Sequence, residues 1–263
     1  MSRAATPPTV GDQITTLLTG FTLTTAAREL VSRFVAAEQQ AALPLLRDVF
    51  ELEAQERHER RITRLRRASQ LPPGKTFATL DEGRLPPALV RRLHELAEGD
   101  FLEEATNVLA FGLPGVGKSH AMCAVGHALV DRGHAVRFMP TYSLVQELLA
   151  AKRNLDLPRA LRKLDQFAVL ILDDVGYIQQ SPEEAEILFT LLAERYERRS
   201  VFITSNLIFA QWDRIFRDQM ATAAAIDRLV HHSVLLEFDV PSFRTEHAKR
   251  CGKAPTRPVA PAS

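Results

Sequence analysis

Eight consecutive residues have the types and spacing needed to hold a chain of phosphates. Residues 112–119 read GLPGVGKS, a complete match to the pattern G-x-x-x-x-G-K-[ST]. Its three glycines let the backbone turn its N–H groups inward around phosphates. Lys118 would reach the β- and γ-phosphates, and the Ser119 hydroxyl would bind Mg²⁺. The motif therefore predicts an ATP site formed by Gly112, Leu113, Pro114, Gly115, Val116, Gly117, Lys118, Ser119 and His120.

Two adjacent carboxylates supply the chemistry that a phosphate loop lacks. Asp173 and Asp174 follow the apolar run 168–172, which reads as a buried strand. In open α/β sheets, ligands bind at the carboxyl ends of strands. We expect Asp173 to hold Mg²⁺ and Asp174 to orient or deprotonate the attacking water. A solvated turn or a helix cap is the alternative, but the phosphate loop favours the metal-binding interpretation.

A polar amide follows the next apolar run, 201–204. Asn206 is placed there to hydrogen-bond the γ-phosphate or the attacking water. The alternative is that Ser205 or Asn206 only caps the start of a following helix.

These candidates require a sheet that brings strand ends together. From residue 107 onward, short apolar runs alternate with amphipathic helical segments. This alternation predicts an α/β domain with a mostly parallel five-stranded sheet. The expected strands are 108–111, 135–139, 168–172, 201–204 and 234–238, and the expected helices are 119–131, 143–151, 182–195 and 221–230.

Residues 1–100 read as helical. Apolar residues recur at helical spacing over 26–46, a highly charged helix continues over 49–65, and another follows over 87–101. The segment Pro72-Pro73-Gly74 ends the second of these. We expect a small all-helical N-terminal domain over 1–76, an ATPase domain over 77–249, and a disordered tail over 250–263.

Composition limits the possible classes of protein. The 263 residues are 46% hydrophobic with a formal net charge of +1, which argues against a uniformly basic nucleic-acid binder. No run reaches the ~20 apolar residues that span a bilayer, so we expect no membrane partner. Two cysteines, Cys123 and Cys251, fit a reducing cytoplasm, with Cys123 as a buried apolar residue. His231 and His232 have no partners at metal-ligand spacing, which favours packing or interface roles.

Basic residues nevertheless gather over 57–67. Spacings of three and four place several of these arginines on one side of a helix. Such a stripe would neutralise DNA phosphates without reading bases. A solvated helix face is the alternative, because Glu51, Glu53 and Glu56 lie just upstream. The candidate DNA contacts are Arg57, Arg60, Arg61, Arg64, Arg67 and Lys75.

Several segments together resemble the IstB-type transposition helper ATPases (insertion-sequence ATP-binding proteins), AAA+ proteins related to DnaC-type helicase loaders. The resemblance covers most of the chain, from residue 26 to residue 249. Its most specific motifs are TSNLIFAQW over 204–212 and DRLVHHS over 227–233. It also rests on LPPGKT over 71–76, the segments 107–120, 170–177 and 223–233, and SFR over 242–244.

The resemblance implies roles for three residues. Asn206 would sense the γ-phosphate, Arg228 would act as an arginine finger in a neighbouring subunit's site, and Arg244 would be a second sensor. A guanidinium suits developing phosphate charge because it is planar and permanently charged. Arg228 could instead simply neighbour Asp227 on a solvated helix face. Many members of the family carry Asp-Glu where this chain has Asp-Asp, so we hypothesise slow basal hydrolysis.

The resemblance also implies a function. An ATP-bound homo-oligomer would assemble on duplex DNA and recruit or stimulate a cognate transposase. The alternative is a DnaC-like loader, which would bind a replicative helicase and prefer single strands. A metabolic P-loop kinase would need a substrate pocket and lid, which no motif over 140–164 indicates.

Overall fold

The computed structural model describes residues 7–176, 181–208, 211–212, 215 and 219–243. Its contacts divide the chain into two compact units, Met1–Arg64 and Leu65–Ser263. The sequence analysis placed its domain boundary later, after residue 76. Residues 72–76 belong with the second unit because they bond to one of its helices: the His127 ring nitrogen Nε2 lies 3.1 Å from the Pro72 carbonyl oxygen.

The N-terminal unit is built from helices. They are α1 (Val10–Gly20), α2 (Thr24–Ala36) and the first part of α3 (Leu43–Ser69). Thr9 and Asp12 cap α1 reciprocally, since each side chain accepts the other's backbone N–H. The helical pattern predicted over 26–46 is interrupted, because Glu38 adopts φ +58° and a 3₁₀ turn follows at Gln40–Ala42. The unit's buried core consists of Ile14, Leu18, Phe21 and Leu43.

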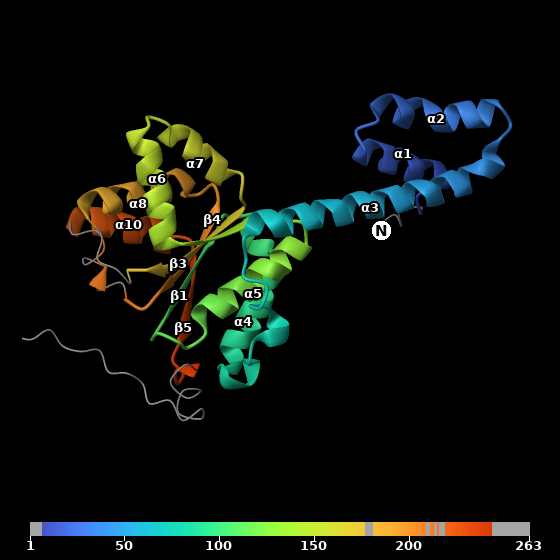
Figure 1. Ribbon diagram of the computed structural model, residues 1–263. Coiled ribbons are helices and arrows are strands. Elements are labelled where there is room, and N and C mark those ends of the chain that lie inside the picture. Colours follow the sequence, from blue (N-terminus) through green and yellow to red (C-terminus); the bar gives the residue numbers. More distant parts are fainter. Residues whose placement is uncertain (1–6, 177–180, 209–210, 213–214, 216–218, 244–263) are drawn as a thin grey trace, which may run out of the picture. The chain divides into compact units, whose positions relative to one another are not determined.

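The second unit contains the predicted five-stranded sheet (Figure 1). Its order is β2-β3-β4-β1-β5, and all four neighbouring pairs are parallel. Each predicted apolar run overlaps one observed strand. The strands are β1 (Asn107–Gly112), β2 (Val136–Pro140), β3 (Val169–Val175), β4 (Ser200–Ser205) and β5 (Ser233–Phe238).

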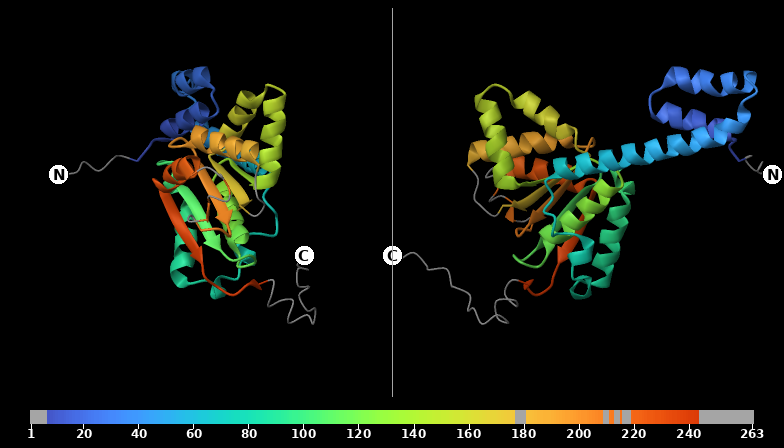
Figure 2. Two further views of the ribbon diagram at one scale, coloured as in Figure 1. Left: turned by 90° about the vertical axis from the view of Figure 1, so that its left-hand side faces the viewer. Right: turned by 45° about the vertical axis from the view of Figure 1, so that its right-hand side comes forward.

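Helices cover both faces of this sheet (Figures 1 and 2). Side chains alternate along β1, so Val108 and Ala110 pack on one side while Leu109 and Phe111 pack on the other. The first side carries α4 (Pro87–Glu98) and α5 (Lys118–Asp131). The second carries α6 (Thr141–Arg153), α7 (Leu157–Asp165), α8 (Pro182–Arg195) and α10 (Gln219–Val230). The sequence analysis did not predict α7.

All five strands run in one direction, so their carboxyl ends meet at one edge of the sheet. This edge receives the loop after β1, the aspartates of β3 and the residue after β4.

Among the described helices, none is both long and apolar enough to cross a bilayer.

Candidate nucleotide site

The phosphate-loop motif connects β1 to α5, as its sequence predicts. Gly112, Gly115 and Gly117 have φ values of +151°, +83° and +103°, which side-chain-bearing residues rarely adopt. A Cβ on Gly112 would lie 2.6 Å from the Phe238 carbonyl oxygen, so only glycine fits there. A Cβ on Gly117 would meet nothing within 4 Å. The loop is therefore closed against β5 at its start and open at the first turn of α5.

Lys118 points back into its own loop. Its Nζ donates hydrogen bonds to the carbonyl oxygens of Gly112 at 2.7 Å and Leu113 at 2.9 Å, and the residue is only 6% exposed. The half-buried hydroxyl of Ser119 has no hydrogen-bond partner among the described residues. The lysine ammonium therefore lies inside the loop, and no described residue occupies the serine hydroxyl.

The aspartate pair sits on a β-bulge. Leu172 pairs with Ile203 and Val175 pairs with Ser205, so Asp173 and Asp174 together stand opposite one residue of β4. Asp174 adopts φ +59°, a left-handed conformation that aspartate tolerates better than most residues. Strand β3 therefore continues through the pair, whereas the sequence analysis ended its strand at residue 172.

Thr204 stands opposite the bulge and holds both aspartates. Its hydroxyl donates to Asp173 Oδ1 at 2.6 Å and accepts the Asp174 backbone N–H at 2.9 Å. The Thr141 hydroxyl adds a 2.8 Å bond to the Asp173 carbonyl oxygen. Sequence analysis missed Thr204 as a site residue and treated it as the end of a strand. The available signal was a polar residue, here fully buried, closing an apolar run.

Asn206 lies beside the phosphate loop. Together with Gly112 and Leu113 it lines a cavity of about 410 Å³. Ser205 makes the local turn instead: its hydroxyl donates to the Val175 carbonyl oxygen at 2.8 Å and accepts the Leu207 N–H at 3.1 Å. The exposed Asn206 amide has no hydrogen-bond partner among the described residues, so the structure brings this side chain to the loop without a capping bond.

His120 contacts the segment before β1, and Lys75 of that segment contacts β2. His120 Nε2 lies 3.1 Å from both the Thr76 carbonyl oxygen and the Thr79 hydroxyl, so this ring nitrogen is engaged by the segment 76–79. Lys75 Nζ lies 5.8 Å from the centroid of the Phe138 ring on β2. Cys123 in α5 is fully buried, and burial raises the pKa of its thiol to about 12, which confirms its apolar role. Cys251 lies outside the described residues.

Arg228 belongs to α10 and packs on a neighbouring helix. Its guanidinium carbon lies 4.7 Å from the centroid of the Phe189 ring of α8. Nη1 is buried and has no hydrogen-bond partner within the described part of the chain. The structure therefore gives Arg228 an aromatic neighbour rather than the solvated position of the alternative interpretation. Arg244 lies outside the described residues.

The five candidate DNA-contact arginines of α3 are exposed, and two of them pair with a carboxylate of the same helix. Glu53 pairs with Arg57 at 2.5 Å and with Arg60 at 3.5 Å. For Arg64 and Arg67 the described residues provide no carboxylate partner. Arg61 also projects to solvent, while Lys75 lies beyond the helix. The solvated-face interpretation thus fits the start of the stripe better than its end.

Strand order, phosphate loop and carboxylates at the end of β3 together define an AAA+ ATP-binding protein of the P-loop class. A solved structure of AMPPCP-bound DnaA from Aquifex aeolicus shares this fold, with a TM-score of 0.55 and 17% identity over 72% of this chain and 59% of that chain. The family model described as IstB-like ATP binding protein matches residues 16–251. The chain belongs to this family.

Two relatives illustrate the similarity. A Sinorhizobium fredii protein named "Putative insertion sequence ATP-binding protein" is 42% identical over 220 residues, which cover 83% of this chain and 74% of that protein. The "Insertion sequence IS21 putative ATP-binding protein" of Pseudomonas aeruginosa is 39% identical over 196 residues, 74% of each chain. The resemblance identified from the motifs is confirmed.

Proposed function

We propose that this chain is an ATP-dependent, DNA-binding transposition helper. It assembles on duplex DNA as an ATP-bound homo-oligomer and recruits or stimulates a cognate transposase. The observation that carries the proposal is a complete phosphate loop beside an aspartate pair, in a chain whose relatives are named for insertion sequences.

The described residues fit ATP with Mg²⁺. The loop is open at Gly117, and Lys118 would exchange its two carbonyl partners for phosphate oxygens. The Ser119 hydroxyl and the Asp173 carboxylate are hard oxygen ligands of the kind Mg²⁺ prefers. Thr204 occupies only Asp173 Oδ1, which leaves the second oxygen for the metal or its water. When bound, Mg²⁺ would neutralise the charge that develops on the phosphates.

Hydrolysis would depend on Asp174 and Asn206. Asp174, which lies in the bulge, would orient or deprotonate the attacking water. Asn206, which follows β4, would donate a hydrogen bond to the γ-phosphate. An aspartate is one methylene shorter than the glutamate that many family members carry. Turnover by the isolated chain is therefore slow, and assembly or a partner increases it.

Assembly would use Arg228. To reach the phosphates of a neighbouring subunit, its guanidinium must leave the face of Phe189, where its Nη1 has no hydrogen bond. A γ-phosphate would offer the buried Nη1 of this half-buried side chain an anionic acceptor. ATP would then favour the oligomer by binding more tightly to that state than to the monomer. Arg244 would act as the second sensor.

DNA binding would use the exposed arginines of α3. Arg64 and Arg67 carry the most available charge because no carboxylate pairs with them in the described structure. Arg57 and Arg60 would contribute after exchanging Glu53 for phosphates, and Arg61 and Lys75 would add further contacts. Binding of this kind tolerates sequence changes and weakens with salt.

A mobility-shift titration of duplex DNA with ATP, ADP or no nucleotide, run beside sedimentation, tests the proposal. We expect ATP to produce both tighter DNA binding and a larger species. The double substitution Arg64→Ala with Arg67→Ala should weaken binding. It should also reduce the slope of log K against log salt concentration by about two, because two phosphate contacts are lost. Arg91→Ala on the exposed face of α4 is the matched control.

The outcomes distinguish the alternatives. A monomer that binds DNA equally with and without nucleotide would refute the assembly proposal. A preference for single strands, together with binding to a replicative helicase and no stimulation of strand transfer, would instead support a helicase loader.

A further inference from the structure

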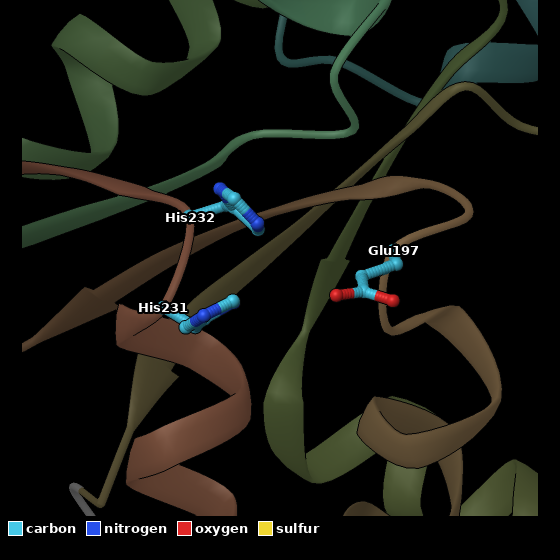
Figure 3. Close-up of side chains that lie close together, drawn as sticks. All are labelled: Glu197, His231 and His232. Atoms are coloured by element: carbon cyan, nitrogen blue, oxygen red, sulfur yellow. The ribbon is translucent and has the colours of Figure 1, made fainter.

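A second cluster of side chains that could bind a metal lies at the amino ends of the strands, whereas the phosphate loop lies at their carboxyl ends. Glu197 lies in the turn before β4, and His231 and His232 lie in the turn before β5 (Figure 3). One ligand atom from each of the three lies within 4.8 Å of the others. The sequence analysis found no metal-binding partner for the two histidines, because Glu197 lies far from them along the chain.

We propose that Glu197, His231 and His232 form a surface site for a divalent transition metal of the Zn²⁺ type. Two imidazoles and one carboxylate form a ligand set that Zn²⁺ uses in proteins, with water in a remaining position. Mg²⁺ would not select this site because it prefers oxygen ligands. Zinc–ligand bonds of about 2.0–2.1 Å place tetrahedral ligands about 3.3 Å apart, so these exposed side chains need only small rotations to close on the ion.

Hydrogen bonds of Asn107 connect the backbone segments under the cluster. The Asn107 side chain donates to the Leu229 carbonyl oxygen at 3.3 Å and accepts the Val201 N–H at 2.9 Å. Its own N–H donates to the His232 carbonyl oxygen at 2.8 Å. This single residue at the start of β1 therefore ties the end of α10 and the start of β5 to the start of β4. The two ligand-bearing turns are held side by side before any ion binds.

The glutamate turn has its own anchor. The guanidinium of Arg195, only 2% exposed, donates to the carbonyl oxygens of Phe167 at 2.9 Å and Ser200 at 3.0 Å. The backbone N–H groups of Arg198 and Arg199 return to the Arg195 carbonyl oxygen, each at 3.0 Å. Glu197 lies within this turn with φ +54°. The turn therefore presents the carboxylate from a fixed backbone.

The Tyr196 hydroxyl takes the place of the carboxylate, carbonyl or water that usually contacts the second nitrogen of a metal-binding histidine. Its hydroxyl lies 3.3 Å from His231 Nδ1, which leaves Nε2 of the same ring for the ion. We assign Tyr196 as a positioning residue. His231 is three residues beyond Arg228 on the same helix end, and its N–H donates to the Asp227 carbonyl oxygen at 3.0 Å. A bound ion would therefore fix the end of the helix that carries Arg228.

The test uses the full chain without a histidine tag and without nucleotide. Zn²⁺ is titrated in competition with a chromogenic chelator, and Co²⁺ absorption reports the ligand geometry. We expect one ion per chain and a rise in the temperature of unfolding with Zn²⁺. Glu197→Gln and the double substitution His231→Gln with His232→Gln should each weaken Zn²⁺ binding at least about tenfold. Tyr196→Phe should weaken it about tenfold while keeping one ion per chain.

His58→Gln, an exposed histidine of α3, is the matched control and should leave Zn²⁺ affinity unchanged. All substituted residues are at least partly exposed, and circular dichroism without metal verifies their folding. Failure of the wild-type chain to compete for Zn²⁺, or equal affinity in the double variant, would overturn the proposal. The result is independent of ATP hydrolysis, so it also stands apart from the proposed function.

Discussion

The phosphate loop and the aspartate pair lie at the same sheet edge but are built in different ways. The loop is one continuous segment whose geometry comes mainly from its own glycines and from the Lys118 bonds to its own carbonyl oxygens. The aspartates depend on another strand, because Thr204 of β4 holds both through one hydroxyl. Binding and hydrolysis should therefore respond to different mutations. Local changes in the loop should abolish nucleotide binding, and changes across the bulge should impair turnover in a chain that still binds ATP.

The largest expected effect comes from Lys118→Ala. It removes the only ammonium in the motif, and each charge-assisted bond to a phosphate contributes about 1.5–3 kcal/mol. We expect ATP affinity to fall about 100-fold or more in a fluorescent-nucleotide titration. Lys152→Ala, which removes an exposed ion pair with Glu186, is the control and should bind normally. Unchanged affinity in Lys118→Ala would refute the nucleotide site itself.

Two glycine substitutions should separate the two ends of the loop. In Gly112→Ala the new Cβ meets the backbone of Phe238, so we expect a loss of about 2–3 kcal/mol in the free energy of unfolding. In Gly117→Ala the Cβ enters open space at φ +103°, which should cost about 1 kcal/mol. Gly117→Ala should nevertheless impair ATP binding, because its methyl group occupies space intended for phosphate. Denaturant unfolding with and without ATP measures both effects, and equal destabilisation by the two substitutions would contradict this account.

Thr204→Val should impair hydrolysis and leave ATP binding largely intact, in contrast to the substitutions in the loop. It preserves shape but removes the hydroxyl that bonds Asp173 and the Asp174 N–H. We expect hydrolysis to fall at least about tenfold while ATP affinity changes only a few fold. Thr204→Ser should restore turnover, and Thr190→Val, which removes a hydroxyl bond within α8, should have no effect on it. Loss of ATP binding in Thr204→Val would show that the two regions are not separable.

The smallest effect is expected for Asp174→Glu. The longer side chain should bring the carboxylate closer to the attacking water and raise basal turnover a few fold. A steady-state phosphate-release assay on the isolated chain measures this, and ATP affinity is the internal control. Turnover equal to or below that of the wild type would contradict the hypothesis that side-chain length limits the basal rate.

The features that depend on residues close together in the chain could mostly be predicted from the sequence. Residues 112–119 specify their own loop, and all five apolar runs became strands of the sheet. Two features escaped because they depend on partners distant in the chain. Thr204 has a role only where β4 meets the bulge in β3, and Glu197 meets the two histidines only because separate turns share one edge. The break at Glu38 escaped for a different reason, since apolar spacing continues through a residue whose backbone has left the helix.

Lys118 also determines which anions the nucleotide-free loop can accept. Its ammonium already has two neutral oxygen partners, so an incoming anion competes with these carbonyl oxygens for the ammonium's N–H donors. Chloride or bicarbonate can offer the lysine one modest contact and little to the surrounding amides. A polyphosphate engages the lysine, the amides and a cation simultaneously, which compensates for the exchange. We therefore expect the nucleotide-free loop to bind small anions more weakly than polyphosphates.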